Sequence, residues 1–161
     1  MTEPKPIDAK TFWRALGNRA LGVVIATAQG ADGPAGFLAL SATHVTADPP
    51  TMLVTIDKRT SALPAILHGK HFALNFLGSG DQALADVFGG KTQVRGADRF
   101  APGRWHPLTT GAPVFDGAVG AMDCALEDTI ERFNVVIAIG RVVDFVARDG
   151  EPLTFFRGAY R

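Results

Sequence analysis

The sequence predicts a single mainly β domain, in which antiparallel strands form a barrel with short helices at its ends. About seven segments have strand-like patterns, whereas two or three short segments have helical spacing. Predicted strands follow one another directly more often than helices separate them, which favours antiparallel pairing over a doubly wound parallel sheet. The chain has 161 residues, enough for one domain with its own core. We therefore expect one domain over residues 1–161, with residues 1–7 as a flexible tail.

The first helix is predicted to begin after Asp8 and to end near Gly17. Asp8 can accept a hydrogen bond from the first helical turn, which is the usual role of an N-cap residue. Within this segment Phe12, Trp13 and Leu16 recur at helical spacing. We interpret this apolar stripe as core packing.

Three apolar runs then predict the strands of the first half. Residues 21–28 indicate a buried strand, and the turn cluster at residues 29–34, which contains Asp-Gly, predicts a hairpin to a strand over residues 35–40. A Pro-Pro corner follows. Residues 51–56 are mostly apolar or β-branched, which is typical of a strand buried on both faces.

The second half of the chain continues the alternation of strands and turns. Residues 89–113 are rich in glycine, proline and charge, and we expect a long irregular segment anchored by Phe100 and Trp105. Cys124 lies in an alternating stretch and is interpreted as a buried structural thiol. Strands are predicted at residues 71–77, 114–130, 133–146 and 153–156, and a short helix at residues 82–88 begins after Asp81 and ends at Gly89 and Gly90.

The loop that follows residue 56 has the chemistry of an anion site. Asp57–Ser61 contains a lysine, an arginine and two hydroxyls, and residues 62–67 resemble a first helical turn with a proline near its start. Backbone N–H groups at a helix N-terminus are unpaired and attract phosphate. A phosphate-binding corner is one interpretation. An ordinary capped helix with solvated charges is the other.

Composition excludes several classes of function. Lys+Arg and Asp+Glu both number 16, so no basic excess exists to bind nucleic acid or an anionic membrane. One cysteine rules out an internal disulfide and a multi-cysteine metal site. No signal peptide or membrane-spanning apolar segment is evident, and we expect a cytoplasmic protein.

No catalytic constellation of protein side chains stands out. The four histidines have no metal-ligand spacing and are interpreted as surface or loop residues, so no metal centre is predicted; they are His44, His68, His71 and His106. No paired carboxylates, nucleophile elbow or Rossmann glycine fingerprint is present. A phosphate-like loop without such groups indicates that an organic cofactor supplies the chemistry.

In their order and spacing, these segments resemble the flavin reductase-like family with its FMN-binding split β-barrel. The resemblance extends over nearly the whole chain. The residues that carry it are Gly22–Thr27, Asp32-Gly33, Ser41, Asp48–Pro50, Asp57–Ser61, Phe72–Leu77, Arg99-Phe100, Gly111–Val114, Ile139–Val142, Asp149–Leu153 and Gly158–Tyr160.

The resemblance implies an NAD(P)H:flavin oxidoreductase whose chemistry occurs at the flavin N5 rather than on a protein side chain. It implies FMN, or FAD, as the flavin, and NADH or NADPH as the hydride donor. It also implies a homodimer and a partner monooxygenase that receives diffusible reduced flavin. The implied cofactor-binding residues are Phe37, Leu38, Ala39, Leu40, Ser41, Asp57, Lys58, Arg59, Thr60, Ser61, Asn75, Phe76 and Arg99.

Two positions depart from the pattern of the family. Leu38 stands where the family usually has threonine, which removes one hydrogen bond to the flavin, worth about 1 kcal/mol. Phe133–Val135 replaces a Gly-Asp-His motif whose histidine lies near the nicotinamide in many members. Two alternatives therefore stay open: a flavoprotein that holds FMN tightly and reduces another substrate, and a non-enzymatic flavin- or heme-binding protein.

Overall fold

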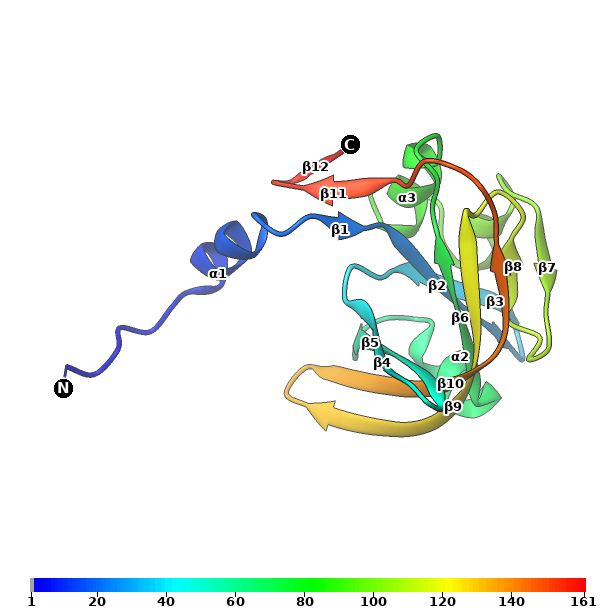
Figure 1. Cartoon of the computed structure of the whole chain (residues 1–161), viewed down its shortest axis with the longest axis horizontal. Coiled ribbons are helices and arrows are strands. Elements are labelled where there is room, and N and C mark those ends of the chain that lie inside the picture. Colours follow the sequence, from blue (N-terminus) through cyan, green and yellow to red (C-terminus); the bar gives the residue numbers. More distant parts are fainter. Residues whose placement is uncertain (1) are drawn as a thin grey trace.

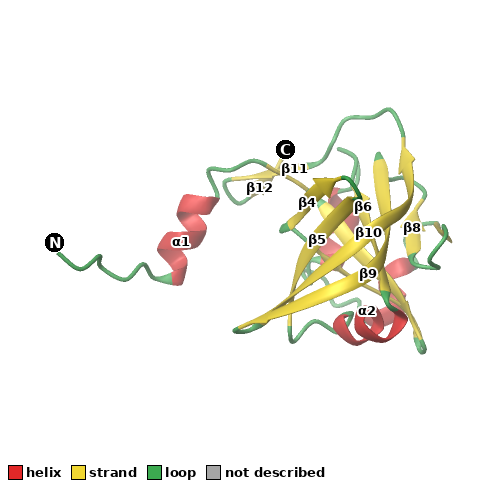
Figure 2. Ribbon diagram, turned by 60° about the horizontal axis from the view of Figure 1, so that its bottom comes forward, coloured by secondary structure: helices red, strands yellow, loops and turns green. Residues whose placement is uncertain are grey.

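A seven-stranded antiparallel sheet in the order β3-β2-β6-β9-β10-β5-β4 forms the centre of the computed structural model, which describes residues 2–161 (Figure 1). The sheet curls on itself, as Figure 2 shows. Within the described residues, no ladder joins the edge strands β3 and β4, so the barrel is split between them. The prediction of a mainly antiparallel β fold is confirmed. The strands are β2 (Val24–Gly30), β3 (Gly33–Leu38), β4 (Ala42–Ala47), β5 (Pro50–Asp57), β6 (His71–Phe76), β9 (Gly120–Arg132) and β10 (Val135–Ala147).

Smaller elements cover the barrel and carry the chain between its strands. One small sheet has the order β1-β11-β12, and β7 pairs with β8 in another. Helix α2 packs on β2, whereas α3 and the 3₁₀ helix η1 pack on β3. The bounds are β1 (Leu21–Gly22), β7 (Trp105–Pro107), β8 (Pro113–Phe115), β11 (Thr154–Phe156), β12 (Ala159–Tyr160), α1 (Ala9–Leu16), α2 (Leu63–Gly69), α3 (Gln82–Phe88) and η1 (Gly96–Phe100). None of the helices between residues 2 and 161 combines the length and hydropathy needed to cross a membrane.

Two of the predicted strands are interrupted. The run at residues 21–28 divides at Val23 into β1 and β2, because the Val23 backbone bonds outside both strands, to Leu153 and Leu77. The strand expected over residues 35–40 ends at Leu38, and β4, which the sequence did not separate, begins after a short connection. These breaks direct successive strands into different parts of the barrel.

Burial of the strands depends on which other elements cover them. In β2, alternate residues point into two separate cores, one inside the barrel and one under α3, so this strand is buried on both faces. In β5, Val54 and Ile56 are buried, but Leu53 and Thr55 are only half-buried. The prediction that residues 51–56 are buried on both faces is therefore wrong, because no helix packs extensively on the outer face of β5.

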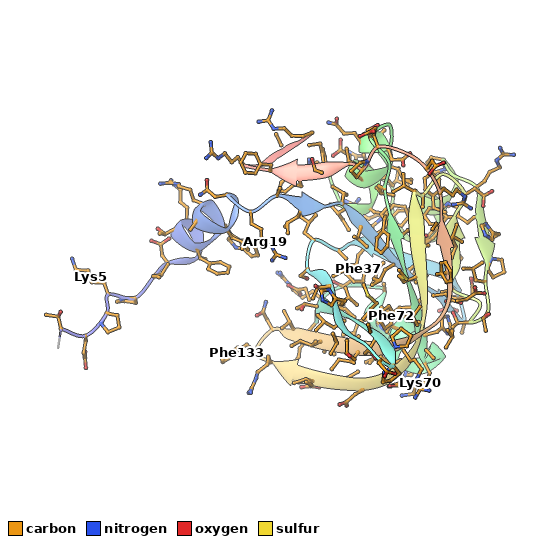
Figure 3. All side chains as sticks on the ribbon, in the orientation of Figure 1. Lys5, Arg19, Phe37, Lys70, Phe72 and Phe133 are labelled. Atoms are coloured by element: carbon orange, nitrogen blue, oxygen red, sulfur yellow. The ribbon has the colours of Figure 1, made fainter. Side chains whose placement is uncertain are left out.

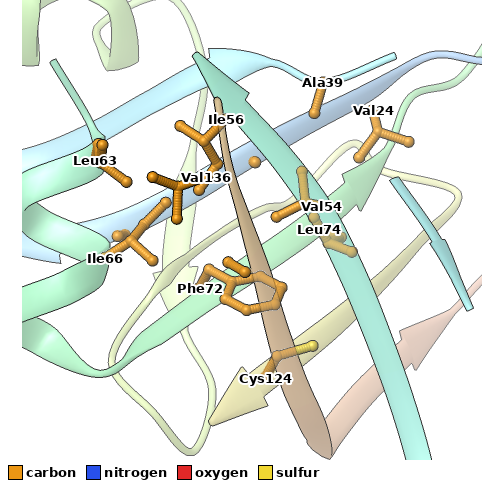
Figure 4. Packing of buried hydrophobic residues seen from close by; sticks show 13 residues of the cluster. Val24, Ala39, Val54, Ile56, Leu63, Ile66, Phe72, Leu74, Cys124 and Val136 are labelled. Carbon is orange, nitrogen blue, oxygen red and sulfur yellow. The ribbon is translucent and has the colours of Figure 1, made fainter. Parts of the chain in front are cut away.

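The core inside the barrel comes from α2 and from the strands β2, β5, β6, β9 and β10 (Figure 4). Ile56, Phe72 and Leu74 are fully buried there, and Ile66 of α2 covers them from one end. Cys124 belongs to the same cluster. Burial, followed by the charge of Asp123, raises the pKa of its thiol to about 12, so the thiol stays protonated at neutral pH, as a structural residue.

The long segment before β8 is anchored as predicted. Phe100 and Trp105 stack edge-on at 4.8 Å between ring centroids, and each also contacts Phe88 of α3. Trp105 further contacts Phe115 at 5.1 Å between ring centroids. This aromatic cluster fixes the segment against the outer face of β3.

Helix α1 has the predicted bounds but not the predicted packing. Asp8 caps it by accepting a hydrogen bond from the Thr11 backbone N–H at 2.8 Å. None of its residues is buried, and Trp13 is 65% exposed. The interpretation of its apolar stripe as core packing is therefore wrong: the helix stands beside the barrel, attached through a bond from the Arg157 backbone N–H to the Gly17 carbonyl (Figure 1).

Candidate functional site

A pocket of about 630 Å³ lies at the split between β3 and β4. Residues 37–41 form one wall, from the end of β3 through the connection to β4. The end of β5 and its following loop supply Thr55, Asp57 and Thr60, and α1 with its linker supplies the opposite wall. Three segments that are distant in the sequence thus surround one cavity.

The wall at residues 37–41 is positioned by both edges of the split. The Ala39 backbone N–H donates to the Val24 carbonyl of β2 at 2.7 Å. The Ser41 hydroxyl donates to the Thr55 carbonyl of β5 at 3.4 Å. The connection therefore bridges the two sides of the barrel and presents Leu40 and Phe37 to the cavity (Figure 3 labels Phe37). All five residues predicted from this stretch are brought together here.

The loop after β5 presents a carboxylate rather than a free guanidinium. The Arg59 guanidinium donates to Asp57 through Nε at 3.0 Å and through Nη2 at 2.9 Å, and the Arg59 backbone N–H donates to it as well. These bonds lower the pKa of Asp57 to about 2 and raise the pKa of Arg59. Asp57 lines the pocket, whereas Arg59 does not, and the Arg59 side chain is 89% exposed.

The other residues of this loop lie in different parts of the structure. Thr60 lines the pocket, and its backbone N–H closes a turn onto the Asp57 carbonyl at 2.9 Å. Lys58 forms an ion pair with Glu131 of β9 at 3.1 Å. Ser61 lines a different hollow, beside α2. The loop therefore delivers two of its five predicted residues to the pocket, and α2 begins after it as predicted.

Asn75 lies in the interior, where its side chain is occupied by the protein itself. Its amide donates to the Ile25 carbonyl at 3.1 Å and to the Thr27 hydroxyl at 3.3 Å. Its carbonyl oxygen accepts from the Phe115 backbone N–H at 2.8 Å. These bonds tie β2, β6 and β8 together and leave Asn75 outside the pocket.

Two further residues from the sequence prediction also lie elsewhere. Phe76 packs against the core inside the barrel. Arg99, on η1, donates to the carbonyls of Val94 at 3.3 Å and Gly36 at 3.4 Å. Neither residue lines the pocket.

Sequence reasoning missed the wall contributed by the N-terminal segment. Phe12, Trp13 and Leu16 of α1, with Arg19 from its linker, face the cavity. The apolar stripe on α1 was visible in the sequence, but its period does not show which element it faces. Phe155 of β11 completes this side of the pocket.

The lining can hold a flat apolar molecule but offers no proton-transfer group near neutral pH. Within the part of the chain that the structure describes, Asp57 and Arg19 are the only charged side chains of the lining, and the low pKa of Asp57 keeps that group ionised. His71, interpreted from the sequence as a surface or loop residue, is instead buried: it accepts from the Gln29 backbone N–H and bonds to the Gly69 carbonyl. His106 pairs with Asp116 on the β7–β8 ribbon. Apolar walls with a few hydroxyls and one guanidinium suit a cofactor that brings its own chemistry.

Comparison with known proteins gives consistent matches over most of the chain. Residues 16–161 match the family model described as "Flavin reductase like domain". The "FMN reductase (NADH) RutF" of Ancylobacter novellus is 36% identical over 155 residues, which cover 96% of this chain and 84% of the relative.

Two solved structures show the same fold. A putative flavin reductase of Haemophilus somnus superposes with a TM-score of 0.92 at 26% identity, covering 96% of this chain and 99% of the other. BorF, the flavin reductase component of a bacterial two-component tryptophan halogenase, superposes with a TM-score of 0.87 at 27% identity, covering 96% and 97%.

Proposed function

Because this chain belongs to the flavin reductase-like family, we propose that it is an NADH-dependent flavin reductase that binds FMN at the split between β3 and β4. The observation that carries this proposal is the apolar pocket at that split, bridged by residues 37–41. The relative from Ancylobacter novellus is named for NADH and FMN, which supports this choice of substrates. NADPH and FAD are the alternatives to be compared with them.

In this proposal the pocket supplies binding and orientation. Phe37, Leu38 and Leu40 give the ring apolar contacts and exclude water, while Ser41 and Thr60 offer hydroxyls. When bound, the flavin supplies the redox chemistry by accepting a hydride from the nicotinamide. Of the cofactor-binding residues expected from the sequence, we retain those that line the pocket, namely Phe37, Leu38, Ala39, Leu40, Ser41, Asp57 and Thr60.

Anaerobic reduction of FMN tests the proposed activity. With catalytic amounts of the protein, NADH is expected to bleach the visible absorbance of excess FMN at a rate proportional to protein concentration. The control omits the protein. Parallel reactions replace NADH by NADPH, or FMN by FAD, to compare the alternative substrates. If the protein binds FMN but NADH does not bleach it, the reductase proposal is contradicted and a binding protein, or a flavoprotein with another reductant, takes its place.

We also propose that the protein is a homodimer that passes reduced flavin to a partner oxygenase. The halogenase component BorF is an example of a reductase of this fold that works with a second enzyme. Trp13 and Phe133 are exposed in the single chain, and Phe133, at the tip of the β9–β10 hairpin, is 94% exposed. Covering such side chains favours association of two chains, and sedimentation equilibrium measures the mass of the assembly in solution.

The proposed compartment is the cytoplasm, where a free thiol such as Cys124 is maintained.

A further inference from the structure

Among residues 2–161, Arg19 is the only cationic side chain that lines the pocket. It follows α1, and its backbone N–H donates to the Leu16 carbonyl at 2.9 Å, which ties its backbone to the end of the helix. Figure 3 shows its side chain extending from this linker into the space beside the barrel. Among the ion pairs and side-chain hydrogen bonds between residues 2 and 161, none involves the Arg19 guanidinium.

The other charge of the pocket does not neutralise Arg19. Asp57 is already engaged by two side-chain bonds from Arg59, so that corner carries a compensated pair. The rest of the lining consists of apolar side chains, glycines and hydroxyls. The cavity therefore has one uncompensated positive charge, on the wall opposite the Asp57 corner.

A free guanidinium on an apolar wall has the chemistry to bind phosphate. Its planar array of donors matches two phosphate oxygens at once, and such charge-assisted bonds are stronger than neutral ones. Arg59, which the sequence favoured for this role, donates through Nε and Nη2 to Asp57 and does not line the pocket, and Ser61 lines another hollow. Arg19 is the residue that brings free guanidinium donors to the lining of the pocket.

We propose that Arg19 binds a phosphate group of the nucleotide that occupies this pocket. The proposal rests on the proposed function, since both FMN and NADH carry phosphate. A guanidinium can bind the phosphate of FMN or the pyrophosphate of NADH through the same charge-assisted hydrogen bonds. Measurements of flavin binding and of the KM for NADH show which of the two Arg19 binds.

The test compares Arg19→Ala with the parent protein and with Arg14→Ala. Arg14 also lies at the end of α1 and is exposed, but it does not line the pocket, so its removal controls for the loss of one positive charge. Dissociation constants for FMN and riboflavin are measured by fluorescence quenching, and the KM for NADH is measured with saturating riboflavin as acceptor. Arg19→Lys serves as a second variant that keeps the charge but loses the planar donors.

Two outcomes support the proposal and identify the phosphate. If Arg19 holds the flavin phosphate, Arg19→Ala weakens FMN about tenfold and leaves riboflavin unchanged. If it holds the pyrophosphate of NADH, the KM for NADH rises about tenfold at unchanged kcat while both flavin constants stay constant. In either case Arg14→Ala behaves as the parent, and Arg19→Lys is intermediate.

Two other outcomes overturn the proposal. One is that all three constants of Arg19→Ala stay within twofold of the parent. The other is that FMN and riboflavin weaken equally, which would show that the side chain contacts the ring instead of a phosphate. The flavin-binding measurements do not depend on turnover, so they can refute the role of Arg19 even where reduction by NADH succeeds. Failure of the parent protein to bleach FMN would count against the proposed reductase function alone.

Discussion

Replacing Asn75 by leucine is expected to lower the free energy of unfolding by about 3 kcal/mol. The substitution leaves the Phe115 backbone N–H and the Ile25 carbonyl without the partner they have in the barrel. Each buried polar group that loses its partner costs about 1–3 kcal/mol. Urea unfolding followed by circular dichroism measures the change.

A smaller change in the same network calibrates this prediction. Thr27→Val removes the hydroxyl that donates to the Pro113 carbonyl, and we expect a loss of about 1 kcal/mol. The FMN affinity of folded Asn75→Leu is expected to stay within about twofold of the parent, because Asn75 does not line the pocket. A variant with parental stability but weak FMN binding would contradict this account and return Asn75 to the flavin site.

Removing the aromatic wall of α1 is expected to weaken FMN binding about thirtyfold without destabilising the barrel. The double variant Phe12→Ser/Trp13→Ser takes away two large apolar side chains that line the pocket, and contacts of this size are worth about 2 kcal/mol. Both residues are exposed, and no residue of α1 is buried. Serine has a helix propensity close to that of phenylalanine and tryptophan, so the helix should persist.

Titration of FMN and thermal unfolding of the double variant check both parts of this prediction. Ile7→Ser is the matched control, because Ile7 is an exposed apolar residue of the same terminal segment that does not line the pocket. Unchanged FMN affinity in the double variant would mean that α1 is not a wall of the flavin site. A large fall in the melting temperature would mean that the helix stabilises the fold.

The order and type of most elements could be predicted because their signals are local. The Asp8 cap, the Asp-Gly hairpin and the glycines after α3 act within a few residues of the structure they define. Continuous apolar runs marked β2 and β6, whose burial from both sides follows from their composition. The breaks at Val23 and at residues 39–41 had no such signal, since distant strands cause them.

The candidate site was predicted in part for the same reason. The stretch at residues 37–41 lines one wall as a unit because neighbouring residues share one connection between edge strands. The loop after β5 is different, because the bonds between Arg59 and Asp57 redirect the arginine away from the pocket. An asparagine in an apolar strand, such as Asn75, looks the same in the sequence whether its side chain binds a ligand or forms hydrogen bonds with backbone groups.

By itself the sequence determined that this chain forms an antiparallel β-domain, and it predicted that an organic cofactor supplies the chemistry in place of catalytic side chains. It did so because alternation, capping and composition depend on residues that are neighbours along the chain. Only the tertiary structure decided that α1 forms a wall of the pocket and that Arg19, rather than Arg59, lines it. A periodic pattern shows that a face is apolar, but what covers that face depends on segments far away in the sequence, here residues 12–19, 37–41 and 55–60.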